Sequence, residues 1–223
     1  MTIGPDDAAY ATDSALPIIY AIPSPFSRPA NISLEWMKSE DFVSLQGIAT
    51  TKDAKGFIVA DYSMGLFFID RATKATQRVD YAGGTTLLGI DGLIRNGNTL
   101  IAVQNGIAPA RILAITLDAS GNSVTGAKVL SANDPNIPEP SLGTMRADDY
   151  CVVANAQWSR FNEDGTLLWL NLRLRSETGG TAQVFYYPST SGPSVPTRTG
   201  ALEFGFHAVP TSAFHTTASI PEP

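Results

Sequence analysis

The feature of this chain that most constrains its fold is a repeated pattern of short strand-like runs. Each run is apolar or alternating and rich in β-branched and aromatic residues, and tight turns such as Asn96-Gly97-Asn98 separate the runs. In no stretch do apolar residues recur with the sustained period of an α-helix. The runs group into four sets: 8–12 and 17–22; 48–51, 57–61, 66–70 and 77–81; 92–95, 99–104, 112–117 and 127–131; and 142–146, 150–154 and 158–161.

The second run of each set ends close to an Asp or an Asn, and these residues mark the length of the repeat. The markers are Asp13, Asp61, Asn105 and Asn155, separated by 48, 44 and 50 residues (61−13, 105−61 and 155−105). A period of roughly 40–50 residues that contains four short strands is typical of β-propeller blades. The sequence therefore predicts an all-β fold of the β-propeller class. Each marker is expected to cap its turn with its own side chain.

The repeats do not account for a whole ring. Propellers have roughly four to eight blades, whereas residues 1–168 contain about three blades plus fragments at both ends. The first set leaves almost no room for an innermost strand before Ala8. An open arc exposes strand edges and apolar surface. We therefore expect an incomplete propeller whose open edges are covered by self-association or by missing blades from another chain.

The character of the sequence changes from about residue 169 onward. No lysine follows Lys128, and residues 188–200 are dense in Pro, Ser, Thr and Gly. The runs 183–187 and 202–206 have the composition of strands but do not continue the repeat. The sequence thus predicts a partial β-propeller over 1–168 and a poorly ordered tail over 169–223.

Charge and hydropathy exclude several classes of partner. The formal net charge of −6 argues against nucleic acid and against anionic lipid, both of which require a basic surface. No apolar run approaches the roughly 18 residues of a membrane-spanning helix. Residues 1–8 carry two aspartates and no basic residue, so they lack the charged start of a secretory signal. We expect a soluble chain, and the sequence does not indicate its cellular compartment.

The scarcity of histidine and cysteine limits the chemistry that the chain can perform. The two histidines, His207 and His215, both lie near the C-terminus, and Cys151 is the sole cysteine. A Ser-His-Asp triad or a histidine metal cluster is therefore not expected in the repeats. Cys151 lies in a strand-like run and is interpreted as a buried structural thiol. Any chemistry in the repeats must be carried by carboxylates and amides.

Several segments resemble the blade sequences of one known family. Residues 7–14 resemble its "D-G-x-A-Y-V-T-D-S" strand pair, 45–49 with 57–63 resemble "L-N-G-I-A … L-I-V-A-D-Y-S", 88–93 resemble the "x-P-D-G-[LM]" turn, and 153–158 with 161–165 resemble a late blade. Over roughly residues 2–168 the chain is similar to the C-terminal part of the six-bladed β-propellers of the gluconolactonase and senescence-marker-protein (regucalcin)-like family.

The resemblance implies a metal site at the mouth of the central channel. In the family a divalent cation, usually calcium, is held there by an acidic residue, an Asn and an Asp, and such a cation can polarise a lactone carbonyl and activate water. Asp91 matches the aspartate, as metal ligand and catalytic centre, and Gln46 occupies the asparagine position. The family's N-terminal glutamate has no counterpart in the matched segments.

Alignment of the blades extends this set of candidate residues. Gln46, Asp91 and Ser141 lie 15, 14 and 14 residues before their markers (61−46, 105−91 and 155−141), so they occupy equivalent ring positions. Glu139 lies close to Ser141 in the sequence, and Arg111 follows the third marker, so both are candidate binding residues. The alternatives are a simple Asp-Gly turn for Asp91, a channel-lining role for Gln46, and solvated surface positions for the other two.

Three functional interpretations follow from these residues. The first is a metal-dependent lactone or ester hydrolase of the gluconolactonase type, acting on a small molecule. The second is a non-catalytic propeller that serves as an interaction or ligand-binding module. The third is a remnant that does not fold stably without further blades. The fold alone does not choose between them, because propellers host many functions.

Overall fold

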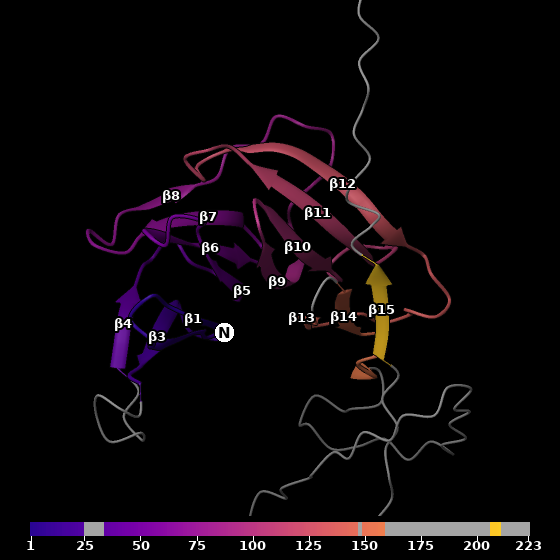
Figure 1. The fold of residues 1–223 in the computed structure, drawn as a ribbon, viewed down its shortest axis with the longest axis horizontal. Helices are drawn as coiled ribbons and strands as arrows, with labels where there is room; N and C mark the ends of the chain where they lie inside the picture. The colour runs from indigo at the N-terminus through magenta and orange to yellow at the C-terminus, as the bar shows by residue number, and fades with distance from the viewer. Residues whose placement is uncertain (25–33, 147–148, 159–205, 211–223) are drawn as a thin grey trace, which may run out of the picture.

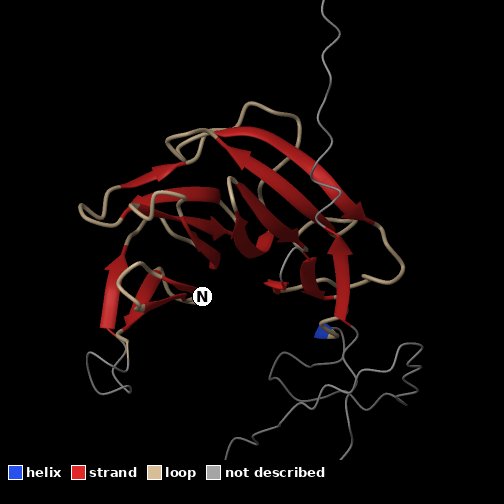
Figure 2. Ribbon diagram, in the orientation of Figure 1, coloured by secondary structure: helices blue, strands red, loops and turns tan. Residues whose placement is uncertain are grey.

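The computed structural model describes residues 1–24, 34–146, 149–158 and 206–210. These residues form four antiparallel β-sheets that follow one another along an arc, with the first strand of each sheet nearest the centre (Figures 1 and 2). The prediction of an all-β fold of the β-propeller class is confirmed, and the described arc is an incomplete propeller. Within those residues, no helix has the length and apolar character needed to cross a bilayer.

The first three sheets have four strands each, in chain order from the centre outward. The strands of the first sheet are β1 (Thr2–Ile3), β2 (Ala9–Thr12), β3 (Ile18–Ile22) and β4 (Leu34–Lys38); those of the second are β5 (Leu45–Thr50), β6 (Gly56–Asp61), β7 (Gly65–Asp70) and β8 (Thr76–Arg78); those of the third are β9 (Ile90–Asn96), β10 (Thr99–Gln104), β11 (Arg111–Leu117) and β12 (Val124–Ala132). Each is a meander of neighbouring hairpins, as the repeat predicts.

The fourth sheet is built from segments that are far apart in the chain. It consists of β13 (Gly143–Arg146), β14 (Asp149–Val153) and β15 (Phe206–Pro210), in that order. The strand β15 belongs to the segment predicted as a tail, and its backbone pairs with β14 from Asp149↔Pro210 to Val153↔Phe206. The remainder of that segment, 169–205 and 211–223, lies outside the described residues, as does the run 183–187.

The first sheet corrects one expectation from the sequence. An innermost strand was not expected before Ala8, yet β1 pairs with β2 through Thr2↔Tyr10 and Ile3↔Ala9. The connecting turn is closed by a hydrogen bond of 2.8 Å from Gly4 N to Ala8 O. Two residues are too few to show an alternating pattern, so the sequence did not indicate this strand.

Neighbouring sheets pack face to face through strands that are buried on both sides. In β6 all six residues are buried; Phe57 and Val59 join the cluster with the first sheet, whereas Ile58 and Ala60 join the cluster with the third. This alternation follows from the two-residue period of a strand. Burial on both faces explains why β6 reads as a continuous apolar run.

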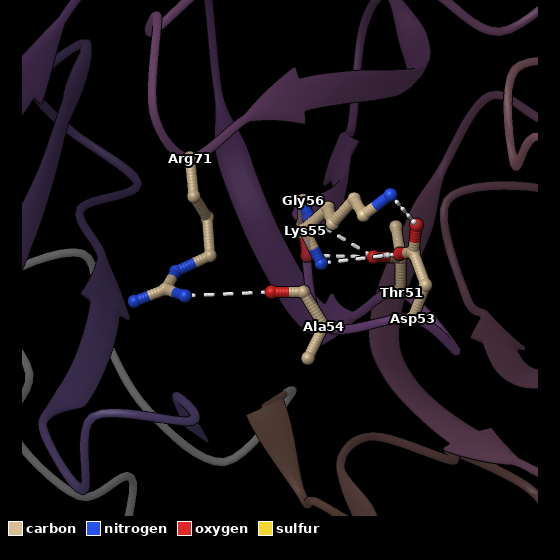
Figure 3. Close-up of polar contacts among 6 residues, drawn as sticks. All are labelled: Thr51, Asp53, Ala54, Lys55, Gly56 and Arg71. Carbon is tan, nitrogen blue, oxygen red and sulfur yellow. Dashed lines mark hydrogen bonds and ion pairs between the residues drawn. The ribbon is translucent and has the colours of Figure 1, made fainter.

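Aromatic rings and one arginine hold the first and second sheets together. Tyr10, Trp36 and Phe57 are mutual neighbours, with ring centroids 4.6–5.4 Å apart. The Arg71 guanidinium lies 5.7 Å from the Phe57 ring centroid, and its Nη1 donates a hydrogen bond of 3.4 Å to Ala54 O (Figure 3). Phe57 therefore lies at the centre of this contact between sheets.

We expect Phe57→Ala to lower the free energy of unfolding by about 3–5 kcal/mol, because it removes a fully buried ring and leaves a cavity. Denaturant unfolding of the full chain, followed by tryptophan fluorescence, measures this loss. The control is Leu34→Ala, whose side chain is 42% exposed and whose expected loss is about 1 kcal/mol or less. Equal losses in the two variants would contradict this packing.

Candidate functional site

The carboxylate of Asp91 is the centre of a polar cluster between the third and fourth sheets. Asp91 is the second residue of β9, the innermost strand of the third sheet, and it is half-buried. Its Oδ2 accepts hydrogen bonds from Asn105 Nδ2 at 2.8 Å and from Ser141 Oγ at 2.9 Å. Two residues aligned from the sequence, Asp91 and Ser141, are thus in direct contact.

The side chain of Asn105 connects three sheets. Its Nδ2 donates to Asp91 Oδ2 in the third sheet and to Pro140 O, at 3.0 Å, before the fourth. Its Oδ1 accepts a hydrogen bond of 3.0 Å from the hydroxyl of Tyr62, which follows β6 in the second sheet. We call Tyr62, Asp91, Asn105 and Ser141 the Asp91 cluster.

Two glycines allow the innermost strands to approach closely enough for this contact. A Cβ atom on Gly92 would lie 3.2 Å from Ser141 O, and one on Gly47 would lie 2.5 Å from Leu93 N. Each glycine directly follows an aligned candidate residue, Gln46 or Asp91. In both places the polar candidate residue is therefore the chain neighbour of the glycine at which two innermost strands come close.

Burial and the charge of Asp91 affect two tyrosines. Burial raises the pKa of Tyr62, and the negative charge of Asp91 raises it further. Burial also raises the pKa of Tyr150 above its usual range, with Asp91 as the second cause. Among the described residues, Tyr150 Oη is buried without a hydrogen-bond partner, and Asp91 Oδ1 accepts no hydrogen bond. The Asp91 carboxylate thus keeps one oxygen without a hydrogen bond from the described residues, whereas the Tyr150 hydroxyl is enclosed in the core between the third and fourth sheets.

The Gln46 side chain is not part of the hydrogen-bonded cluster. Its Nε2 donates to Ser44 Oγ at 3.4 Å, within its own sheet. Its backbone carbonyl accepts a hydrogen bond from Thr12 Oγ1 of the first sheet. Within the residues that the structure places, no hydrogen bond joins the Gln46 amide to Asp91.

Glu139 and Arg111 are engaged elsewhere. The Glu139 Oε2 atom accepts a hydrogen bond of 3.1 Å from Trp158 N, so this carboxylate fixes the end of the fourth sheet. Arg111 Nε donates to the buried Gln104 Oε1 at 2.6 Å. The Gln104 amide in turn donates to the carbonyls of Thr86 and Leu88 in the loop before β9. Neither predicted binding residue donates to or accepts from Asp91 in the described part of the chain.

The Asx markers divide into three caps and one exception. The side-chain oxygens of Asp13, Asp61 and Asn155 accept hydrogen bonds from backbone N–H groups two or three residues later, as predicted. Asn105 does not: β10 ends at Gln104, which has the place that Asp61 has in β6, and the Asn105 side chain is hydrogen-bonded to Tyr62, Asp91 and Pro140 instead. Its role in the cluster was missed by the sequence reasoning, and the adjacent Gln104-Asn105 pair was the available signal.

The described residues do not fit the calcium ion that the family resemblance implies. Calcium takes roughly six to eight oxygen ligands, often several carboxylates. No group of three or more His, Cys, Asp or Glu side chains that could hold a metal occurs in the described ranges. The cluster has a single carboxylate, and Asn105 directs its NH2 group toward it rather than its carbonyl oxygen.

Comparisons with known proteins support the fold alone. No protein-family model matches the chain, and neither does any curated protein. Among solved structures, a nidogen/laminin complex matches with a TM-score of 0.52 and 17% identity, over 68% of this chain and 54% of the other. An auxiliary nutrient binding protein from Bacteroides ovatus matches with a TM-score of 0.52 and 9% identity, over 69% and 41%. The chain therefore spans about half of the first of these structures and less of the second.

A third similarity is weaker. A "putative 6-phosphogluconolactonase" from Bacteroides uniformis matches with a TM-score of 0.47 and 11% identity, over 74% of this chain and 51% of the other.

We expect Asn105→Ala to lower the free energy of unfolding by about 1–3 kcal/mol, because it leaves partly buried groups on Asp91, Tyr62 and Pro140 without their partner. Denaturant titration measures the difference. The matched control is Asn96→Ala at the exposed end of β9, which should change stability by about 0.5 kcal/mol or less. A loss at Asn105 no larger than the control loss would show that the amide does not hold the cluster.

Asp91→Asn should lower the pKa of Tyr62 toward that of an ordinary phenol. The substitution removes the negative charge that disfavours the phenolate and leaves burial as the remaining cause. Phenolate absorbance against pH, taken as the difference between each protein and its Tyr62→Phe counterpart, isolates this titration. An unchanged pKa would rule out the electrostatic coupling.

Proposed function

We propose that this chain belongs to a β-propeller that binds a small polyhydroxylated molecule of the sugar-lactone class at the Asp91 cluster. The observation that carries the proposal is the open Oδ1 of a half-buried carboxylate whose other oxygen is held by Asn105 and Ser141. A fixed carboxylate with neighbouring amide and hydroxyl groups matches the hydrogen-bonding pattern of a polyol. Small-molecule sites typically use a few convergent polar groups of this kind.

Each residue has a separate part in such a site. Asp91 Oδ1 accepts a hydrogen bond from a ligand hydroxyl, and the two donors on Oδ2 prevent the carboxylate from rotating. A hydrogen bond to a charged group contributes roughly 1.5–3 kcal/mol. Asp91 is therefore expected to carry most of the affinity.

Hydrolysis of the bound lactone is the second candidate function. It is favoured by the position of Asp91, which matches the aspartate of gluconolactonase-like blades, in the segment 88–93. In this reaction a water oxygen bonds to the lactone carbonyl carbon and Asp91 Oδ1 takes its proton. The ring C–O bond then breaks, and the proton passes to the leaving alkoxide, which gives a hydroxy acid.

The test of binding is calorimetric titration of the full chain with gluconolactam, the ring amide that resists hydrolysis. We expect saturable binding, weakened about tenfold or more in Asp91→Asn. The control Asp41→Asn removes an exposed carboxylate away from the cluster and should change the affinity less than about twofold. Absence of binding by the folded protein, or equal affinity of both variants, would overturn the proposal.

A second measurement separates binding from catalysis. Acid release from glucono-δ-lactone is followed by pH-stat with the full chain, once with added calcium and once with a chelator. Release that is lost in Asp91→Asn supports the hydrolase, and dependence on calcium would show that ligands beyond the described residues complete a metal site. Binding of gluconolactam without acid release identifies a ligand-binding module and rules out the hydrolase.

A further inference from the structure

A pocket lies at the opposite end of the strands from the Asp91 cluster. Its volume is about 320 Å³, and it is lined by three turns of the second and third sheets, at residues 51–53, 95–98 and 117–121. The strand β9 connects the two places, with Asp91 near its start and Arg95 near its end. Four residues of extended strand separate them by about 13 Å. The pocket is thus distinct from the proposed lactone site.

Arg95 lines this pocket, and its Nη2 makes no hydrogen bond to the described residues. Its Nη1 donates to Gly97 O at 3.1 Å. Its Nε is buried and has no partner among the described residues, and no hydrogen bond is made there by Nη2. Because Nε has almost no accessible surface, Nη2 is the guanidinium group that a ligand oxygen can reach. A carboxylate oxygen that accepts from it makes a charge-assisted hydrogen bond.

The two carboxylates of the pocket are hydrogen-bonded within their own turns. Asp53 Oδ1 accepts from Thr51 Oγ1 at 2.7 Å and from Lys55 N at 3.1 Å (Figure 3). Asp118 Oδ2 accepts from Ser120 Oγ at 2.7 Å, and its Oδ1 accepts from backbone N–H groups of the same turn. Both carboxylates are therefore held in place by their own turns.

The formal charge of the pocket and its apolar lining residues limit the kind of anion that it can hold. Lys52 and Arg95 balance the formal charges of Asp53 and Asp118, so a doubly charged anion gains little. The lining also includes the buried side chains of Leu100 and Leu117 beside small residues of the turns. A volume of this size lies at the lower end of small-molecule sites, roughly 300–1,000 Å³.

We propose that this pocket binds a small organic monocarboxylate. A carboxylate oxygen accepts a hydrogen bond from Nη2 of Arg95, and the apolar body of the ligand lies on Leu100 and Leu117. Lys52, which is exposed at the rim, adds long-range attraction that salt weakens. The site goes beyond the proposed lactone function and does not depend on it.

The test is calorimetric titration of the full chain with benzoate at low ionic strength, and separately with inorganic phosphate. We expect saturable benzoate binding, weaker phosphate binding, and about a tenfold or larger loss of benzoate affinity in Arg95→Met. The matched control is Arg146→Met, which removes the same charge from the exposed end of the inner strand β13, outside the pocket. Its effect should stay below about twofold.

A second variant keeps the proposal testable if Arg95→Met does not fold. Ala119→Trp leaves the guanidinium in place and fills the pocket from its exposed rim, so it should also weaken benzoate by about tenfold or more. Asp91→Asn should leave benzoate binding unchanged, which separates this site from the lactone site. No benzoate binding by the folded protein, a preference for phosphate, or full affinity in both pocket variants would overturn the proposal.

Discussion

The close approach of neighbouring innermost strands is the constraint on which the candidate site depends. At Gly47 a Cβ atom would lie 2.5 Å from Leu93 N, and at Gly92 it would lie 3.2 Å from Ser141 O. A side chain at Gly47 would force the second and third sheets apart, and one at Gly92 would crowd the third against the fourth. Asp91 and Ser141 come from different sheets, so their 2.9 Å hydrogen bond exists because the strands meet at this spacing.

Polar contacts repeat at the same end of each sheet and fix how the sheets meet. Thr12 of the first sheet donates to the Gln46 carbonyl of the second, Tyr62 donates to Asn105, and Asn105 donates to Pro140 O before the fourth. The apolar clusters between the sheets supply most of the stabilisation, but burial of apolar area has no direction. Hydrogen bonds have a direction, so these contacts select one arrangement of the sheets.

The sequence predicted the repeating part of the fold well because its strands are short runs of apolar and β-branched residues bounded by turn residues. The run 99–104 coincides with β10, and the run 57–61 lies within β6. The sequence could not predict β15, because its pairing with β14 spans 53 residues (206−153) and leaves no periodic pattern. The cluster was predicted in part. Asp91 and Ser141 were aligned correctly as ring neighbours, whereas Asn105 was assigned to its own turn.

The error at Asn105 has a physical origin that also concerns Gln104. In β6 the terminal Asp61 accepts N–H groups of the loop before β5, at 2.7 and 3.0 Å from Val43 and Ser44. In β10 the terminal Gln104 also binds the loop before the innermost strand of its sheet. Its side chain donates hydrogen bonds to loop carbonyls through Nε2, whereas the Asp61 side chain accepts them. Asn105 therefore corresponds to Tyr62 rather than to Asp61, and its side chain reaches Asp91. An alignment that pairs Asn105 with Asp61 does not show that Gln104 takes the structural place of Asp61.

The same alignment shows where the pattern of close approach ends in the described arc. Position 142, which corresponds to Gly47 and Gly92, is a leucine, and its side chain is 57% exposed. A neighbouring innermost strand cannot approach Leu142 as closely as Leu93 approaches Gly47, because the side chain occupies that space. The Asp91 cluster therefore lies at the last glycine contact of the described sheets. The fourth sheet is preceded by Ser141 and the Pro140 carbonyl, which belong to this cluster, and by the exposed side chain of Leu142.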